Sequence, residues 1–367
     1  MAIILDSIIV TIDSTVIVFV MIFFGVLLTR LKILTIETSN RISKLVINLI
    51  LPCLLFCDMI KSVTISELEN FGIIFIFATF HMFAGSGIGW LLGTLTNANN
   101  EIKKLMMCCI GVQETLAFSL VYANVLGESS VVTESHFKNR AVTDVLVYTV
   151  FITIYKWIIA YGMLKKEDQD NNIESELLDM TEKNEKILVK REDWIYKIKN
   201  IMNPPIYVAI IAIILALIPY MKEYVISGSG SVLKKNVFSA VQDTGAMTTP
   251  LICIILGSNL SEGYPPTADI KWIHIWMINL GKLIIMPLIG ISMFTLFYTI
   301  GFIDRILAIM MIAVYAAPTS KQILIICTNH GNQVENISKI YLIQYMIVAL
   351  PLSIFNVVSI YILYGSD

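Results

Sequence analysis

Four polar residues follow a proline inside an apolar segment near the C-terminal end of the chain. They are Thr319, Ser320, Lys321 and Gln322, directly after Pro318. Proline lacks a backbone N–H and clashes with the preceding turn, so we expect a helix to break just before it and to restart at Thr319. The restart would leave open N–H groups at a helix N-terminus, close to the Lys321 ammonium. The sequence therefore predicts an anion-binding site at this break.

A second polar interruption lies in the first half of the chain, within the apolar run 105–126. Polar, broken segments at corresponding places in two halves of a hydrophobic chain are typical of the substrate site of a secondary transporter. We therefore expect both breaks to contribute substrate-binding residues. The candidates are Gln113, Glu114, Thr115, Pro318, Thr319, Ser320, Lys321 and Gln322.

Charged residues within apolar runs are costly and are usually paired or functional. Glu114 and Lys321 have opposite signs at matching breaks, so they either form a structural ion pair or leave Lys321 to receive a substrate anion. Lys282 is the alternative partner for either role. Lys156 is expected to extend its ammonium to the cytosolic membrane surface, and His81, alone in its apolar run, is expected to pack rather than bind a ligand.

The composition is that of a polytopic membrane protein. Of the 367 residues, 56% are hydrophobic and 15% are charged, and the mean hydropathy is +0.76. Soluble domains carry about 25% charged residues. The formal net charge of −2 gives no reason to expect a nucleic-acid partner, and the six cysteines lie in apolar stretches as small core residues. No cofactor or metal site is expected.

Ten apolar runs are long enough to cross a bilayer of about 30 Å, which predicts an all-α polytopic fold. A polar central segment divides them five and five, so the halves enter the membrane from opposite sides as an inverted repeat. The predicted domains are a five-helix repeat over 1–164, a hydrophilic loop over 165–202 and a second repeat over 203–367. The runs are 8–28, 42–60, 71–92, 105–126, 142–164, 205–220, 238–256, 271–300, 306–327 and 337–363.

Basic residues in the loops predict the orientation of the chain. Loops after odd-numbered spans hold 16 Lys and Arg residues, against 7 in loops after even-numbered spans. Because positively charged loops stay in the cytosol, we expect the central loop to be cytosolic and both termini to lie on the far side. The chain is thus expected to be a multi-pass integral membrane protein of the plasma membrane or the endoplasmic reticulum.

A series of short motifs is similar to the auxin efflux carrier family, which includes the plant PIN and PIN-like carriers and bacterial relatives. The segment 48–56 reads Asn-Leu-Ile-Leu-Pro-Cys-Leu-Leu-Phe, and Asn203-Pro204-Pro205 opens the sixth run. The segment 256–260 reads Leu-Gly-Ser-Asn-Leu, and Pro318 stands in the ninth run. The order and spacing of these motifs carry the resemblance over nearly the whole chain.

The resemblance implies two inverted five-helix repeats whose fourth and ninth helices are broken and cross each other. It also implies a scaffold domain of spans 1, 2, 6 and 7, a transport domain of the other spans, homodimers, and elevator-like movement of small organic anions. Since span 2 faces the transport domain in this family, Asn48 becomes a further candidate for substrate binding. PIN-type members carry proline and asparagine at the first break, where this chain has Gln113 and Glu114.

These observations favour a secondary carrier for a small organic anion, auxin-like or another carboxylate. The alternatives are a membrane receptor or sensor that uses the same fold without transport, and an anion channel. An intramembrane enzyme would need paired aspartates, a serine and histidine, or a zinc site at membrane depth. The sequence has no such arrangement, so no enzyme activity is expected.

Overall fold

The computed structural model describes residues 19–62, 68–115, 119–128, 132, 134, 137–165, 204–216, 218, 233–261 and 270–365. Within these ranges every regular element is helical, which confirms the all-α prediction; the only strand-like feature is one isolated bridge. The predicted central loop falls outside the described residues from position 166 onward.

The helices of the first half follow the apolar runs. After an apolar helix over Phe19–Arg30 come α2 (Ile36–Leu45), the π-helical turn η1 (Val46–Ile50), α3 (Leu51–Ser62), α4 (Leu68–Leu95), α5 (Asn100–Gly111), α6 (Ser119–Glu128), α7 (Phe137–Tyr155), the π-helical turn η3 (Lys156–Ala160) and α8 (Tyr161–Met163).

The second half is helical in the same way. Its elements are α11 (Pro204–Ala216), the π-helical turn η5 (Leu233–Phe238), α13 (Ser239–Ala246), α14 (Thr248–Ser261), α15 (Trp272–Leu280), the π-helical turn η6 (Gly281–Ile285), α16 (Met286–Thr299), α17 (Arg305–Ala316), α18 (Gln322–His330), α19 (Val334–Ile347) and α20 (Ala349–Tyr364).

Among the described residues, five helices are long and apolar enough to cross a membrane, or six if α19 and α20, bent by 53°, form one span. The ten-helix arrangement and the inverted repeat therefore stay predictions. Two of the predicted spans, 105–126 and 306–327, are not continuous helices. A non-helical break separates α5 from α6 in the first and α17 from α18 in the second.

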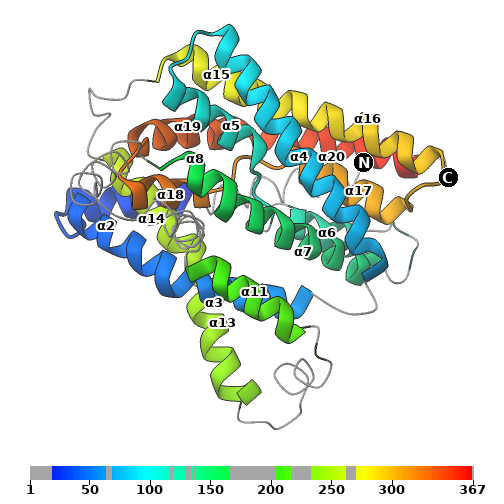
Figure 1. The fold of residues 1–367 in the computed structure, drawn as a ribbon, viewed down its shortest axis with the longest axis horizontal. Helices are drawn as coiled ribbons and strands as arrows, with labels where there is room; N and C mark the ends of the chain where they lie inside the picture. The colour runs from blue at the N-terminus through cyan, green and yellow to red at the C-terminus, as the bar shows by residue number, and fades with distance from the viewer. Residues whose placement is uncertain are drawn as a thin grey trace, which may run out of the picture.

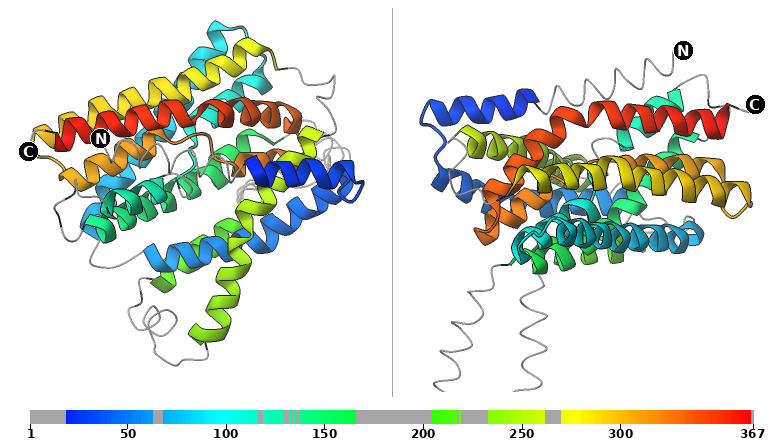
Figure 2. Two further views of the ribbon diagram at one scale, coloured as in Figure 1. Left: turned by 180° about the vertical axis from the view of Figure 1, so that it is seen from behind. Right: turned by 90° about the horizontal axis from the view of Figure 1, so that it is seen from above.

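The helices form two groups in space (Figure 1). In the first group, α3 packs against α11 and α13, and α14 packs against α2. The second group is built around α4, α5, α7, α16, α17 and α20. Figure 2 shows the same separation from behind, and the groups touch where α14 meets α18 and α19 and where α3 meets α7.

The two half-helices α5 and α17 begin in the same way and have the same length. The side chain of Asn99 accepts a hydrogen bond from the Ile102 N–H at 2.8 Å, and that of Asp304 accepts one from the Leu307 N–H at 3.1 Å. Such N-caps satisfy amides that have no partner within the helix. Each helix then runs for 12 residues, and all residues of α17 after its first are buried. The second group is thus packed around α17.

Two glycines bring the helix over Phe19–Arg30 into backbone contact with α14. A Cβ on Gly25 would lie 2.2 Å from the Ile254 carbonyl oxygen, and a Cβ on Gly257 would lie 2.0 Å from that of Ile22. Small residues allow this close approach between membrane helices. The two glycines therefore set how closely these two helices can pack.

We expect Gly257→Val to lower the stability of the folded protein, because the added side chain must force the two helices apart. Overpacking typically costs about 1–3 kcal/mol, and contact with rigid backbone places this site at the upper end. The unfolding temperature in detergent measures the effect. Gly87→Ala is the control, since a Cβ there has nothing within 4 Å; an equal loss in both variants would contradict the packing argument.

Candidate functional site

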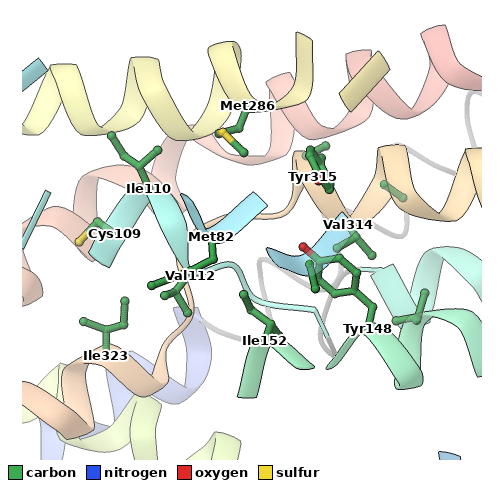
Figure 3. Close-up of a cluster of buried hydrophobic side chains, with 14 of the residues drawn as sticks. Met82, Cys109, Ile110, Val112, Tyr148, Ile152, Met286, Val314, Tyr315 and Ile323 are labelled. Carbon is green, nitrogen blue, oxygen red and sulfur yellow. The ribbon is translucent and has the colours of Figure 1, made fainter. Parts of the chain in front are cut away.

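The two breaks meet as a pair of short extended segments, which we call the crossing (residues 112–115 and 317–320). Gln113 lies opposite Thr319 in an antiparallel bridge. The Glu114 N–H donates to the Pro318 carbonyl at 2.7 Å, and the Ser320 N–H donates to the Val112 carbonyl at 3.1 Å. Figure 3 shows buried side chains packed around this point. The structure therefore brings together the two segments that were predicted to form one site.

The proline explains the shape of the second segment. Ala317, directly before Pro318, is extended at φ −65° and ψ 145°, as expected for a residue that precedes proline. The helix ends at Ala316, which confirms the predicted break, but α18 begins only at Gln322. The predicted restart at Thr319 is therefore wrong.

The sequence predicted open backbone N–H groups after the proline. In the structure these N–H groups already have acceptors. The Thr319 N–H donates to the Gln344 side-chain carbonyl at 2.9 Å, and the Ser320 N–H is used in the bridge. The Lys321 N–H donates to Oε2 of Glu114 at 3.2 Å. Because these amides already have acceptors, an anion would have to be held by side chains.

Neighbouring helices fix the two segments through their polar side chains. Tyr341 of α19 donates from its hydroxyl to the Ser320 carbonyl, and the Thr319 hydroxyl donates to the Cys109 carbonyl at 2.8 Å. From α7, the Tyr148 hydroxyl accepts a hydrogen bond from the Gln113 amide. Thr319 is thus a structural anchor as well as a member of the crossing.

The first segment is also fixed at its far end. The hydroxyl of Thr149 in α7 donates to the hydroxyl of Thr115 at 2.7 Å. Thr115 is buried, with 4% of its surface exposed. The predicted Thr115 therefore lies in the crossing, but its hydroxyl already has a protein partner.

The ion pair between the side chains of Glu114 and Lys321, one of the two alternatives that the sequence left open, is not formed. Glu114 is half-buried and accepts from the backbone N–H of Lys321. Lys321 is 3% exposed, and its buried ammonium has no hydrogen-bond partner among the described residues. Lys282, the alternative partner, instead donates to the Ile110 carbonyl at 3.1 Å. An unpaired ammonium buried at the crossing would be compensated by a bound anion, to which it could donate hydrogen bonds.

Lys156 lies at the crossing, although the sequence predicted that it extends to the membrane surface. It does not extend to the membrane surface: it is 4% exposed, and its ammonium donates to the Ser320 hydroxyl at 3.3 Å. It also lies within electrostatic reach of Glu114. Lys156 follows Tyr148 and Ile152 at intervals of one helical turn, so this spacing was the signal that could have placed it on the face that meets the crossing.

Asn48 is not brought to the crossing. It lies in the π-helical turn η1 with its side chain exposed, and its amide donates to the Lys44 carbonyl at 2.7 Å. The family resemblance suggested that the helix of Asn48 faces the other group, but the Asn48 side chain is exposed and bonds to its own helix. Nothing in this arrangement connects Asn48 with the other candidates.

Four buried polar atoms around the crossing have no hydrogen-bond partner among the described residues. These are the Lys321 Nζ, the Gln344 Nε2, the Gln113 Oε1 and the Gln322 Oε1. Buried polar groups are nearly always satisfied in native proteins. Two donors and two acceptors on or beside the crossing segments are therefore left unsatisfied within the described part of the chain.

Replacing Gln344 by leucine should destabilise the folded protein, because the Thr319 N–H would lose its acceptor in a buried position. Leaving such a donor unsatisfied costs about 1–3 kcal/mol. The unfolding temperature in detergent is the measurement. Thr328→Val in α18 is the control: its buried hydroxyl donates only to the Leu324 carbonyl of its own helix. An unchanged unfolding temperature for Gln344→Leu would show that the crossing does not depend on this bond.

Comparison with known proteins adds an independent observation. The model of the family described as "Membrane transport protein" matches residues 10–356. Protein PIN-LIKES 7 of Arabidopsis thaliana is 22% identical over 370 residues, which cover 90% of this chain and 92% of the relative. Protein PIN-LIKES 5 of the same plant is 22% identical over 373 residues, covering 91% and 92%.

A more distant match covers part of the chain. It is an uncharacterized transporter of Schizosaccharomyces pombe, 23% identical over 176 residues, which are 45% of this chain and 39% of the relative. The matches confirm the resemblance to the auxin efflux carrier family that the short motifs indicated.

Proposed function

We propose that this chain, which belongs to the Membrane transport protein family, is a secondary carrier that binds a small organic anion at the crossing. The family supports transport across a membrane, and the apolar helices support a multi-pass protein of the lipid bilayer. The observation that carries the choice of substrate is the buried Lys321 ammonium, for which the described residues supply no hydrogen-bond partner. A ligand carboxylate would supply the missing negative charge.

The charges at the crossing support an anion rather than a cation or a neutral molecule. Lys321 and Lys156 are both buried there, and Glu114 is the one carboxylate that the described residues place beside them. The excess of positive charge in a medium of low dielectric constant attracts an anion strongly. The amide groups of Gln113, Gln322 and Gln344 would then orient its remaining polar atoms.

The two groups of helices support an elevator-type mechanism. The crossing belongs to the group built around α17. This group touches the other mainly where α18 meets α2 and α14, where α19 meets α14, and where α7 meets α3. We propose that the α17 group carries the bound anion past the other group, which stays fixed. In this proposal the ten spans form two inverted repeats with the central loop in the cytosol.

The family resemblance also supports a homodimer through the first group of helices. Native mass in detergent should then be close to twice the chain mass of 41.2 kDa. A monomeric preparation that transports its substrate would overturn the dimer without affecting the proposed site.

A stabilisation screen tests the substrate class. A ligand that binds only the folded state raises the unfolding temperature, so purified protein is heated with a panel of monocarboxylates, dicarboxylates, organic cations and neutral analogues. Indole-3-acetate is included because the sequence resembles auxin efflux carriers. We expect stabilisation by one or more carboxylates and none by their amides. Stabilisation by cations or neutral analogues alone would overturn the proposal.

A further inference from the structure

A second pair of basic side chains is buried beside the crossing but takes no part in the site described above. Lys282 lies in the π-helical turn η6 and His81 lies in α4, and both are 0% exposed. The Lys282 ammonium donates to the Ile110 carbonyl at 3.1 Å and lies 3.4 Å from the Nε2 atom of His81. For that contact to be a hydrogen bond, His81 must accept it through an unprotonated Nε2.

The surroundings of the pair contain no carboxylate within the described part of the chain. The titratable groups that face it are Cys109 from α5, Tyr315 from α17 and Tyr148 from α7. The α16 and α20 helices, which also pack against η6, contribute no acidic or basic residue. The α15 helix contributes His274, whose Nε2 lies 3.4 Å from the Thr96 carbonyl oxygen. Among the described residues, Lys282 and His81 therefore have no counter-charge beside them, and each lies within 3.4 Å of the other.

Two bases at this distance in an apolar interior do not both carry a proton, because like charges repel strongly where the dielectric constant is low. They titrate as one unit. The pair therefore holds at most one positive charge, which allows it to take up or release a single proton.

The pair is connected to both half-helices that end at the crossing. Ile110, which accepts from Lys282, is in the last turn of α5, and the negative end of a helix dipole stabilises a cation there. The His81 ring makes an edge-to-face contact with the ring of Tyr315, in the last turn of α17, with ring centres 4.2 Å apart. The Tyr148 ring, whose hydroxyl accepts a hydrogen bond from Gln113, also contacts the His81 ring, with ring centres 6.4 Å apart. A change of charge at the pair thus acts on the ends of both segments.

We propose that the His81–Lys282 pair binds the one proton that accompanies each substrate anion, so that the carrier is an anion–proton symporter. The inference rests on the proposed function, since it needs an anion at the crossing. No covalent bond changes: water on one side supplies the proton to the pair, and water on the other side receives it. Binding of the anion and binding of the proton favour each other by linkage. The negative charge of the anion is then balanced by the bound proton while the loaded site moves.

The test uses purified protein in liposomes that contain a trapped pH dye, with the membrane potential clamped by potassium and valinomycin. An inward gradient of labelled indole-3-acetate is applied, and protein-free liposomes correct for passive entry. We expect the lumen to become acidic with about one proton per anion. Wild-type transport of the anion with no movement of protons overturns the proposal.

Variants identify the pair as the proton site. In Lys282→Gln and in His81→Asn, the ratio of protons to anions should fall by about tenfold or more. Lys271→Gln is the matched control, because Lys271 is exposed at the start of the same predicted span and should keep the wild-type ratio. An unchanged ratio in either variant of the pair overturns the assignment. The two variants are made separately so that a folding defect in one leaves the other as the test.

A measurement without substrate separates this inference from the proposed function. The unfolding temperatures of the wild type and of Lys282→Gln are compared from pH 5 to pH 9. If Lys282 only caps α5 and keeps its proton throughout, the difference is constant with pH, and the inference is overturned. A difference that changes with pH shows that the pair exchanges a proton, even if no anion in the panel proves to be a substrate.

Discussion

Replacing Lys321 by methionine should abolish anion binding without lowering the stability of the folded protein. The buried ammonium has no hydrogen-bond partner among the described residues, so its removal breaks no hydrogen bond of the described structure. On insertion scales a central lysine costs about 2.5–3.5 kcal/mol, and methionine avoids this cost. Truncating one member of a buried charge pair costs about 2–5 kcal/mol, so anion affinity should fall by roughly 30-fold or more.

Two measurements on the same samples check this expectation. The unfolding temperature without ligand should be equal to or higher than that of the wild type, and stabilisation by the best anion of the screen should disappear. Lys271→Met, at an exposed lysine, should leave both values unchanged. If Lys321→Met instead unfolds the protein and anion binding survives in the remaining folded fraction, Lys321 is a structural residue and the choice of substrate is wrong.

Changes at Glu114 should have the second largest effect, and two substitutions separate its charge from its hydrogen bond. Glutamine keeps a carbonyl that can accept from the Lys321 N–H, now seen at 3.2 Å. It removes the one negative charge placed beside Lys321 and Lys156. At an effective dielectric constant of 20, a unit charge 4 Å away is worth about 4 kcal/mol, and part of this is screened because Glu114 is half-buried. Anion affinity in Glu114→Gln should therefore rise by about tenfold.

Tighter binding should slow release of the anion, so exchange in liposomes is expected to show both a lower KM and a lower kcat. Glu114→Leu adds a loss of stability of about 1–3 kcal/mol, because the Lys321 N–H then has no acceptor. The difference between the two variants isolates the hydrogen bond. Weaker anion binding in Glu114→Gln would contradict the expectation that the negative charge of Glu114 opposes anion binding.

Much of the site's location could be predicted from the sequence, because it follows from backbone chemistry. A proline without an N–H sets the break at Pro318, and the glycine at the end of α5 precedes the other break. Both signals depend only on local residue types. The meeting of the two breaks followed from their matching places in the halves of the chain, and the structure confirms it through the bridge between Gln113 and Thr319.

The partners of these residues could not be predicted, because they depend on how each helix is rotated about its axis. Hydropathy places Lys156 and Asn48 in spans but does not say which face they occupy, and the structure buries the first and exposes the second. The acceptors Gln344 and Glu114 come from distant positions, so the occupied amides after Pro318 were beyond a local analysis. Glycines such as Gly25 mark close packing only when the partner helix is known.

Counterflow in liposomes tests the central claim most directly. Vesicles loaded with unlabelled indole-3-acetate, or with the best carboxylate of the screen, are diluted into medium that contains a trace of the labelled anion. The account predicts that wild-type protein concentrates the label transiently inside, because a carrier exchanges one bound anion for another, and that Lys321→Met does not. Label entry without an overshoot would indicate a channel, and no entry would indicate a receptor. An overshoot in Lys321→Met equal to that of the wild type would show that the anion does not bind at the crossing.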